Sequence, residues 1–110
     1  MPLEQPTAAE RQEKREGEAM ARGEHSDPRM RKVDQNLREI FDRQHELDLW
    51  SSSKSRAGTL SDPDRARYKA ETRRNEQDKL ANLKAAQRID PSYRTAEISG
   101  EIRRLESEGY

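Results

Sequence analysis

The stretch that decides the fold runs from residue 27 to residue 50 and reads DPRMRKVDQNLREIFDRQHELDLW. One set of side chains in it returns at alternating spacings of three and four residues and has a single polar member: Met30, Val33, Leu37, Ile40, Gln44 and Leu47. This is the spacing of one face of an α-helix. Phe41 and Trp50 widen the apolar stripe. The pattern therefore predicts an amphipathic helix over residues 28–50, ~34 Å long at 1.5 Å per residue.

Asp-Pro pairs mark where this helix and two others are expected to begin. The first pair is at residues 27–28, and two more follow at 62–63 and 90–91. Proline fits the first helical position because that amide has no partner inside the helix. The residue before a proline is pushed out of the α region, where an N-cap sits, and an aspartate there accepts bonds from the free amides. The pairs predict a second long helix over 63–88 and a shorter third helix over 91–108.

The composition limits how large a core the chain can bury. Of its 110 residues, 40% are charged and only 14 are Leu, Ile, Val or Phe. That share is below the roughly 20% under which chains often fail to offset the entropy of ordering. The 22 basic and 22 acidic residues cancel, so a large net charge does not argue for disorder. We expect an all-α fold, hairpin-like or coiled-coil-like, that gains stability by association.

Two segments flank or interrupt this predicted helical domain of residues 28–110. Residues 1–27 form a charged segment with few apolar side chains, which predicts a poorly anchored tail or frayed helix. Residues 51–61 read SSSKSRAGTLS, and a serine-rich composition with a glycine is typical of a flexible connector.

The residue inventory argues against most kinds of chemistry. The chain has no cysteine and only two histidines, His25 and His45, and the second lacks the partners of a helical metal motif. There is no glycine-rich phosphate loop and no nucleophile motif. We therefore expect no enzymatic activity, no catalytic residue, no metal, no cofactor and no small-molecule substrate. No apolar run reaches the roughly 18 residues that span a bilayer, and no secretory signal is visible, so a cytoplasmic protein without membrane contact is expected.

The main functional hypothesis is a structural or adaptor component that binds a protein partner or a second copy of itself. Its docking face would be the apolar stripe of residues 30–50, with Trp50 as an anchor. The same stripe could instead pack inside the chain against apolar residues of the later helices. The side chains of the predicted docking face are Met30, Val33, Leu37, Ile40, Phe41, Leu47 and Trp50.

The alternative hypothesis is a nucleic-acid-binding accessory or regulatory protein. Residues 54–74 contain seven basic and three acidic side chains, and a basic helix can follow phosphates. Tyr68 lies among them and offers a ring for stacking. A solvated face on a highly charged protein explains the same pattern. The candidate nucleic-acid-binding residues are Arg65, Arg67, Lys69, Arg73 and Arg74.

Overall fold

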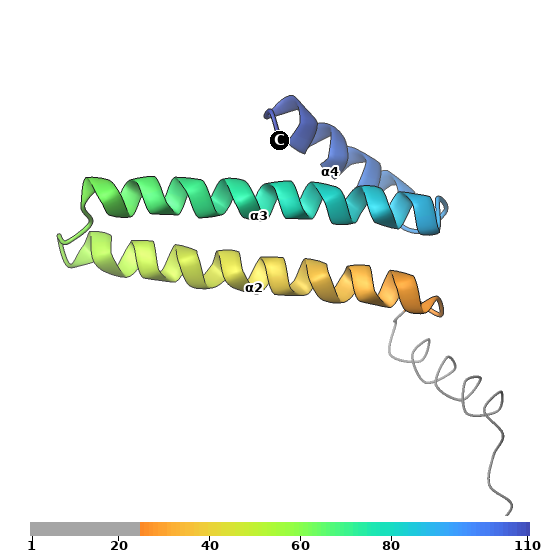
Figure 1. Cartoon of the computed structure of the whole chain (residues 1–110), viewed down its shortest axis with the longest axis horizontal. Coiled ribbons are helices and arrows are strands. Elements are labelled where there is room, and N and C mark those ends of the chain that lie inside the picture. Colours follow the sequence, from red (N-terminus) through yellow and green to blue (C-terminus); the bar gives the residue numbers. More distant parts are fainter. Residues whose placement is uncertain (1–24) are drawn as a thin grey trace, which may run out of the picture.

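A computed structural model of the chain describes residues 25–110 (Figure 1). This part is all-α, as predicted, and contains three helices and no strand. They are α2 (Pro28–Arg56), α3 (Asp62–Ile89) and α4 (Thr95–Ser107). The predicted charged segment 1–27 lies outside the described residues except for its last three.

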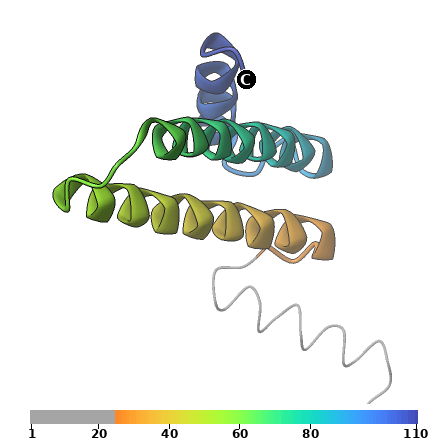
Figure 2. The same ribbon diagram turned by 60° about the vertical axis from the view of Figure 1, so that its left-hand side comes forward.

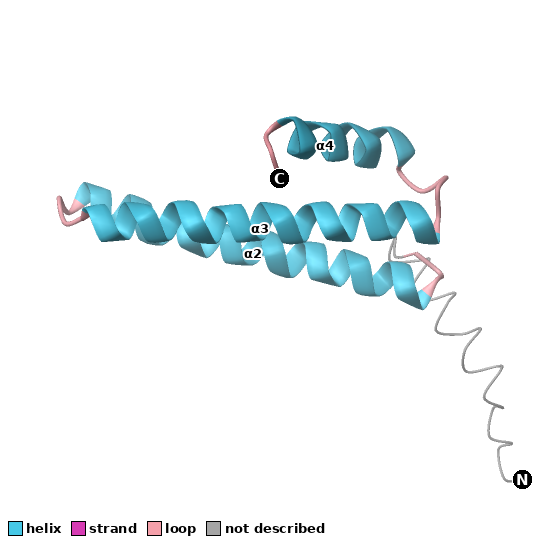
Figure 3. Cartoon of the chain, turned by 45° about the horizontal axis from the view of Figure 1, so that its top comes forward, coloured by secondary structure: helices cyan, strands magenta, loops and turns pink. Residues whose placement is uncertain are grey.

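Helices α2 and α3 form a long antiparallel hairpin, and α4 folds back along α3 (Figure 1). In Figure 2 α4 stands on the side of α3 that faces away from α2. Figure 3 shows α2 and α3 crossing at a shallow angle, with α4 beyond α3. The backbones of α2 and α4 both approach α3 but do not approach each other.

The apolar core lies at one end of the hairpin, where all three helices meet. Two of its side chains, Met30 and Leu105, are completely buried. Leu37, Ile89 and Tyr93 are half-buried against it. The core residues are Met30, Val33, Leu80, Leu83, Ala86, Ile98, Ile102 and Leu105.

The loop end of the hairpin is joined mainly by polar contacts between α2 and α3. Gln44 accepts a hydrogen bond from Asn75 Nδ2 at 2.9 Å and lies 3.1 Å from Thr72 Oγ1. Tyr68 Oη donates to Asp48 Oδ1 at 2.6 Å. Lys54 Nζ meets Asp64 Oδ2 at 3.0 Å. Leu47 is the buried apolar side chain that α2 contributes at this end.

Helix α2 is longer than predicted. It ends at Arg56 instead of residue 50, so the connector expected over 51–61 is confined to 57–61. Serine is only slightly less favourable in a helix than the best residues, so the four serines between residues 51 and 55 do not stop it. The helix stops where Gly58 adopts a left-handed backbone, with φ at 70°, and Thr59 N–H bonds back to Lys54 O at 2.9 Å.

The three Asp-Pro pairs start their helices in three different ways. Asp27 is an N-cap, and its Oδ1 accepts from Arg29 N–H at 2.8 Å. Helix α3 is capped one residue earlier, by Ser61 in a capping box with Asp64. At the third pair the prediction was wrong by four residues, since α4 begins at Thr95 instead of residue 91.

The reason is a turn that Asp90 closes with its own side chain. Asp90 Oδ1 accepts from the backbone N–H of Ser92 at 3.1 Å and lies 2.7 Å from the Ser92 hydroxyl. Arg94 then takes a left-handed backbone, with φ at 45°. The aspartate oxygens that were expected to cap a helix thus stabilise the turn between α3 and α4.

Candidate interaction surface

The structure divides the predicted docking face between the core and the surface. Four of its seven side chains are buried inside the chain: Met30, Val33, Ile40 and Leu47. Leu37 and Trp50 are half-buried. Phe41 is 70% exposed. The stripe as a whole is therefore used by the hairpin itself, and the part left at the surface is centred on Phe41.

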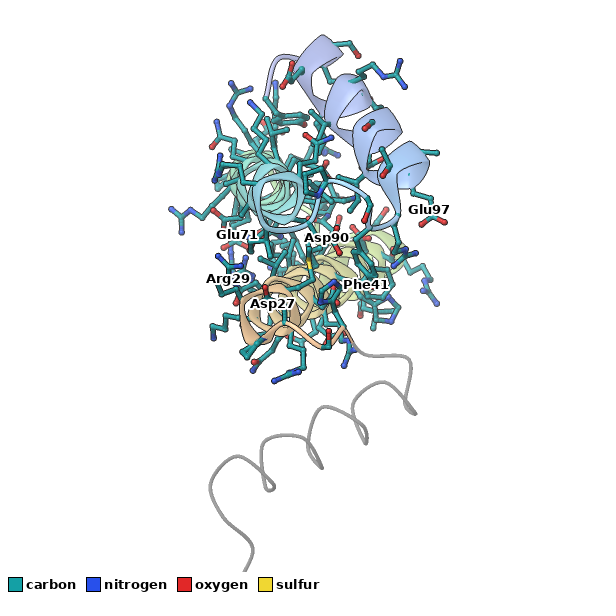
Figure 4. The ribbon with its side chains drawn as sticks, turned by 90° about the vertical axis from the view of Figure 1, so that its right-hand side faces the viewer. Asp27, Arg29, Phe41, Glu71, Asp90 and Glu97 are labelled. Atoms are coloured by element: carbon teal, nitrogen blue, oxygen red, sulfur yellow. The ribbon has the colours of Figure 1, made fainter. Side chains whose placement is uncertain are left out.

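Phe41 is exposed because of its angular position on α2. The core face of this helix passes through Val33, Ile40 and Leu47. Phe41 follows Ile40 directly, so it points about 100° away from that face. Its ring lies parallel to the His45 imidazole, with centroids 6.3 Å apart. In Figure 4 Phe41 lies on the same side of the hairpin as Glu97 of α4, and Glu71 lies on the other side.

A groove begins beside Phe41 and runs between α2 and α4. It consists of two adjoining hollows of about 410 and 360 Å³, which share the same side chains where they meet. The shared residues are Asp34, Leu37, Tyr93 and Arg94. The inner hollow continues over α3, where Leu83 and Ala86 line it, and reaches Ile98 of α4.

His25 holds the turn before α4, whose Tyr93 lines the groove. Asp27 N–H donates to His25 Nδ1 at 2.9 Å, so the ring proton is on Nε2, which donates to Asp90 Oδ2 at 2.7 Å. The imidazole also meets the Tyr93 ring edge-on at 5.0 Å. The Ser92 hydroxyl and His25 together hold the pKa of Asp90 below its usual value. These contacts connect the start of α2 to the turn that carries Tyr93.

Ion pairs attach α4, which forms one wall of the groove, to α3. Glu101 accepts from Lys79 Nζ at 2.8 Å and also binds Arg104. Arg104 reaches Glu76 on α3 as well, at 3.4 Å. Hydrogen bonds from Arg104 and Lys79 lower the pKa of Glu101 to about 2, so this carboxylate stays charged far into the acid range.

The predicted nucleic-acid-binding residues separate into two rows on α3. At 100° per residue, Arg65, Lys69 and Arg73 share one side of the helix, and Arg67 and Arg74 point roughly to the opposite side. All five are exposed. Several already have partners, since Arg65 pairs with Asp62 at 3.0 Å and Arg67 with Glu71 at 3.1 Å. Arg73 lies over the Tyr110 ring at 5.6 Å.

Arg67 and Arg74 border a third hollow, of about 440 Å³, near the loop end. Arg43 of α2 also lines it, as do the carboxylates of Glu46 and Glu71. Trp50 forms part of its wall, with Arg67 4.8 Å and Lys54 5.2 Å from the ring centroid. The charges of this hollow are mixed.

Five residues that line the hollow beside Phe41 were not predicted from the sequence: Asp34, Arg38, Asp42, Tyr93 and Arg94. A signal for the first two was available. Asp34, Arg38, Phe41 and His45 are spaced four, three and four residues apart, which places them in a second stripe on the outer side of the helix. No comparable signal exists for Tyr93 and Arg94, because their position depends on how α4 folds back.

Within residues 25–110, no group of three or more His, Asp or Glu side chains is arranged to hold a metal ion. The three described helices also lack an apolar segment long enough to cross a membrane. Comparisons with protein-family models, with curated proteins and with solved structures find no match for this chain.

Proposed function

We propose that this protein is a non-enzymatic helical interaction component that docks a partner helix along the groove between α2 and α4. The observation that carries this proposal is the exposure of Phe41, 70% in the middle of the longest helix. An aromatic side chain fully removed from water contributes about 1.5–3 kcal/mol. In a chain with so few large apolar residues, leaving that contribution unused favours a role in binding.

The surroundings of Phe41 suit a helix better than a flat surface. The groove is bounded by two helices on a third, so an added helix would contact all three, as helices do in a small bundle. Its floor is apolar, with Leu37 and Leu83 in it. Its rim carries charges of both signs, including Asp34, Arg38 and Arg94. Such charges set the orientation of a partner more than its affinity.

The proposal can be tested by replacing Phe41 with a photo-crosslinking phenylalanine analogue in the cells that make the protein. Leu49 is a matched control, because it lies on the same helix and is also exposed, at 54%, but borders none of the three hollows. We expect adducts from position 41, identified by mass spectrometry, and few from position 49. Equal labelling from both positions, or no adduct from position 41, would contradict the proposal.

Nucleic-acid binding is a second candidate, supported by the exposed row of Arg65, Lys69 and Arg73 on α3. A labelled single-stranded or duplex oligonucleotide titrated at two salt concentrations would measure it by fluorescence anisotropy. Binding through this row should weaken steeply with salt and should fall further when Lys69 is changed to Glu. The Arg103→Glu variant on α4 is the control. Absence of binding at low salt would remove this candidate.

A further inference from the structure

We infer that the helix seated against Phe41 is α2 of a second copy of this chain, in an antiparallel homodimer. This inference rests on the proposed function, because it uses the same surface and names its occupant. The evidence is the order of side chains along the outer stripe of α2, which is complementary to itself when reversed.

The outer stripe follows a coiled-coil spacing. Three of its residues, Asp34, Arg38 and Phe41, line the groove. The stripe continues to His45 and Asp48 in one direction and to Arg31 in the other. When two copies of a helix cross antiparallel about a two-fold axis, the numbers of facing residues add to a constant. With the axis between Arg38 and Phe41, that constant is 79.

The two inner layers of this arrangement each bring together groups that attract. Arg38 faces Phe41 of the second copy, and a guanidinium over an aromatic face is a favourable cation–π contact. Asp34 faces His45 of the second copy, which places a carboxylate beside an imidazole. The two-fold axis repeats both contacts.

The outermost layer places Arg31 opposite Asp48 of the second copy, again with opposite charges. Both side chains already have partners within their own chain, since Arg31 donates to Ser26 O at 2.8 Å and Asp48 accepts from Tyr68. The inner layers therefore carry the inference. Shifting the register by one helical turn toward lower numbers places Asp34 against Arg38 and Phe41 against Arg31. Arg31 is already bound to the backbone carbonyls of His25 and Ser26, so the register with Phe41 under Arg38 is favoured.

The groove gives the second α2 a place to lie. Asp34, Leu37, Arg38 and Phe41 form its α2 wall, and Tyr93 and Arg94 form the opposite wall. A helix crossing Phe41 therefore also meets the turn before α4. Each copy contributes one aromatic ring, and the layers are otherwise polar. We therefore expect a small and transient interface that buries less than about 1,200 Å² of surface in total.

Sedimentation equilibrium tests whether the dimer exists. The full-length chain should shift from its monomer mass of 12.8 kDa toward twice that mass as its concentration rises from about 10 µM to about 1 mM, the range of weak contacts. Phe41→Ala removes one ring from each copy and should raise the dissociation constant about 100-fold, taking about tenfold per ring. Leu49→Ala should leave it unchanged. A monomer at every concentration would overturn the inference.

Disulfide trapping tests the register. The chain has no cysteine of its own that could form other disulfides. A disulfide requires Cα atoms within about 7 Å. Mixing Asp34→Cys protein with His45→Cys protein should give the mixed disulfide, and Asp34→Cys mixed with Leu49→Cys should not. A dimer in which Asp34→Cys links to itself instead would indicate a parallel pairing and would overturn the antiparallel one.

The two proposals can fail separately. If the purified chain stays monomeric but position 41 crosslinks to a different protein in cells, the homodimer is wrong and the docking role of the groove stands. If position 41 gives no adduct to any protein, including a second copy, the docking role fails as well.

Discussion

The two ends of the α2–α3 hairpin are held together by different kinds of contact. At the end near α4, eight side chains form an apolar core in which Met30 and Leu105 have no exposed surface. At the loop end, the helices are joined by hydrogen bonds such as those of Gln44 with Asn75 and of Tyr68 with Asp48. One pair of helices thus changes from apolar to polar contact along its length.

This difference indicates a division between stability and alignment. Apolar burial is strong but not directional, so the core can hold the helices without fixing how the loop end is paired. Hydrogen bonds contribute only about 0.5–1.5 kcal/mol each in net terms, but a wrong pairing leaves buried groups unsatisfied at a cost of about 1–3 kcal/mol. The polar end therefore selects one register for the helices that the apolar end holds together.

The largest effect should come from removing core volume at the apolar end. Leu83→Ala should lower the free energy of unfolding by about 2–5 kcal/mol, because a buried cavity adds to the lost transfer energy. Urea denaturation followed by circular dichroism would measure it. Leu49→Ala, at an exposed site of the same hairpin, should change stability by no more than about 0.5 kcal/mol. Equal effects of the two changes would mean that the core is not where the structure places it.

The next largest effect should come from the buried amide at the loop end. Asn75→Ala leaves the Gln44 carbonyl without its donor and should cost about 1–3 kcal/mol. The double variant with Leu at both Gln44 and Asn75 should recover most of that loss or exceed the parent stability, because neither polar group remains. A double variant that is less stable than Asn75→Ala would show that the amide pair stabilises the fold directly.

A smaller and local effect is expected at Tyr68. Tyr68→Phe removes the 2.6 Å hydrogen bond to Asp48 and should reduce stability by about 1 kcal/mol. Native-state hydrogen exchange should show faster opening near Asp48 and Thr72 and little change near Leu83, because local opening can be confined to one part of a structure. Uniformly faster exchange along both helices would mean that the two ends open as one unit.

The smallest effect should appear in acid, at the contact of α4 with the apolar end. The pKa of Glu101 is lowered to about 2 in the folded chain, below the 4.5 of an unperturbed side chain. Its contribution is therefore complete above about pH 4.5 and is lost as the pH falls toward 2. Denaturation at several pH values should show that the free energy of unfolding falls less over this pH range for Glu101→Gln than for the parent. If Glu101→Gln loses as much stability as the parent over this pH range, Glu101 is not the cause of the acid destabilisation.

Much of this fold could be predicted from the sequence because its helices carry strong local signals. Asp27 and Pro28 mark the start of α2, and the spacing of Val33, Ile40 and Leu47 marks its core face. The end of α2 was missed because serine composition is a weak stop signal. Gly58, which does end the helix, lies eight residues past the predicted boundary at residue 50, inside the segment predicted to be a flexible connector.

The groove could be predicted only in part. The apolar pattern identifies Phe41 as part of the stripe, but it does not predict that Phe41 is exposed. A broad stripe fits both a wide core and a narrow core with one residue outside it. Tyr93 reaches the groove through the turn that Asp90 closes and through the contact with His25. The contact of His25 with Tyr93 joins residues that are far apart in the chain, and a local pattern carries no information about it.

The single tryptophan of this chain gives the loop end its own optical reporter. Trp50 lies between Lys54 and Arg67 there, whereas the apolar core lies toward the other end of the hairpin. Its emission therefore follows the separation of the polar end alone, and circular dichroism follows all three helices. If the hairpin unzips from its loop, the fluorescence melt will precede the loss of ellipticity without any added label.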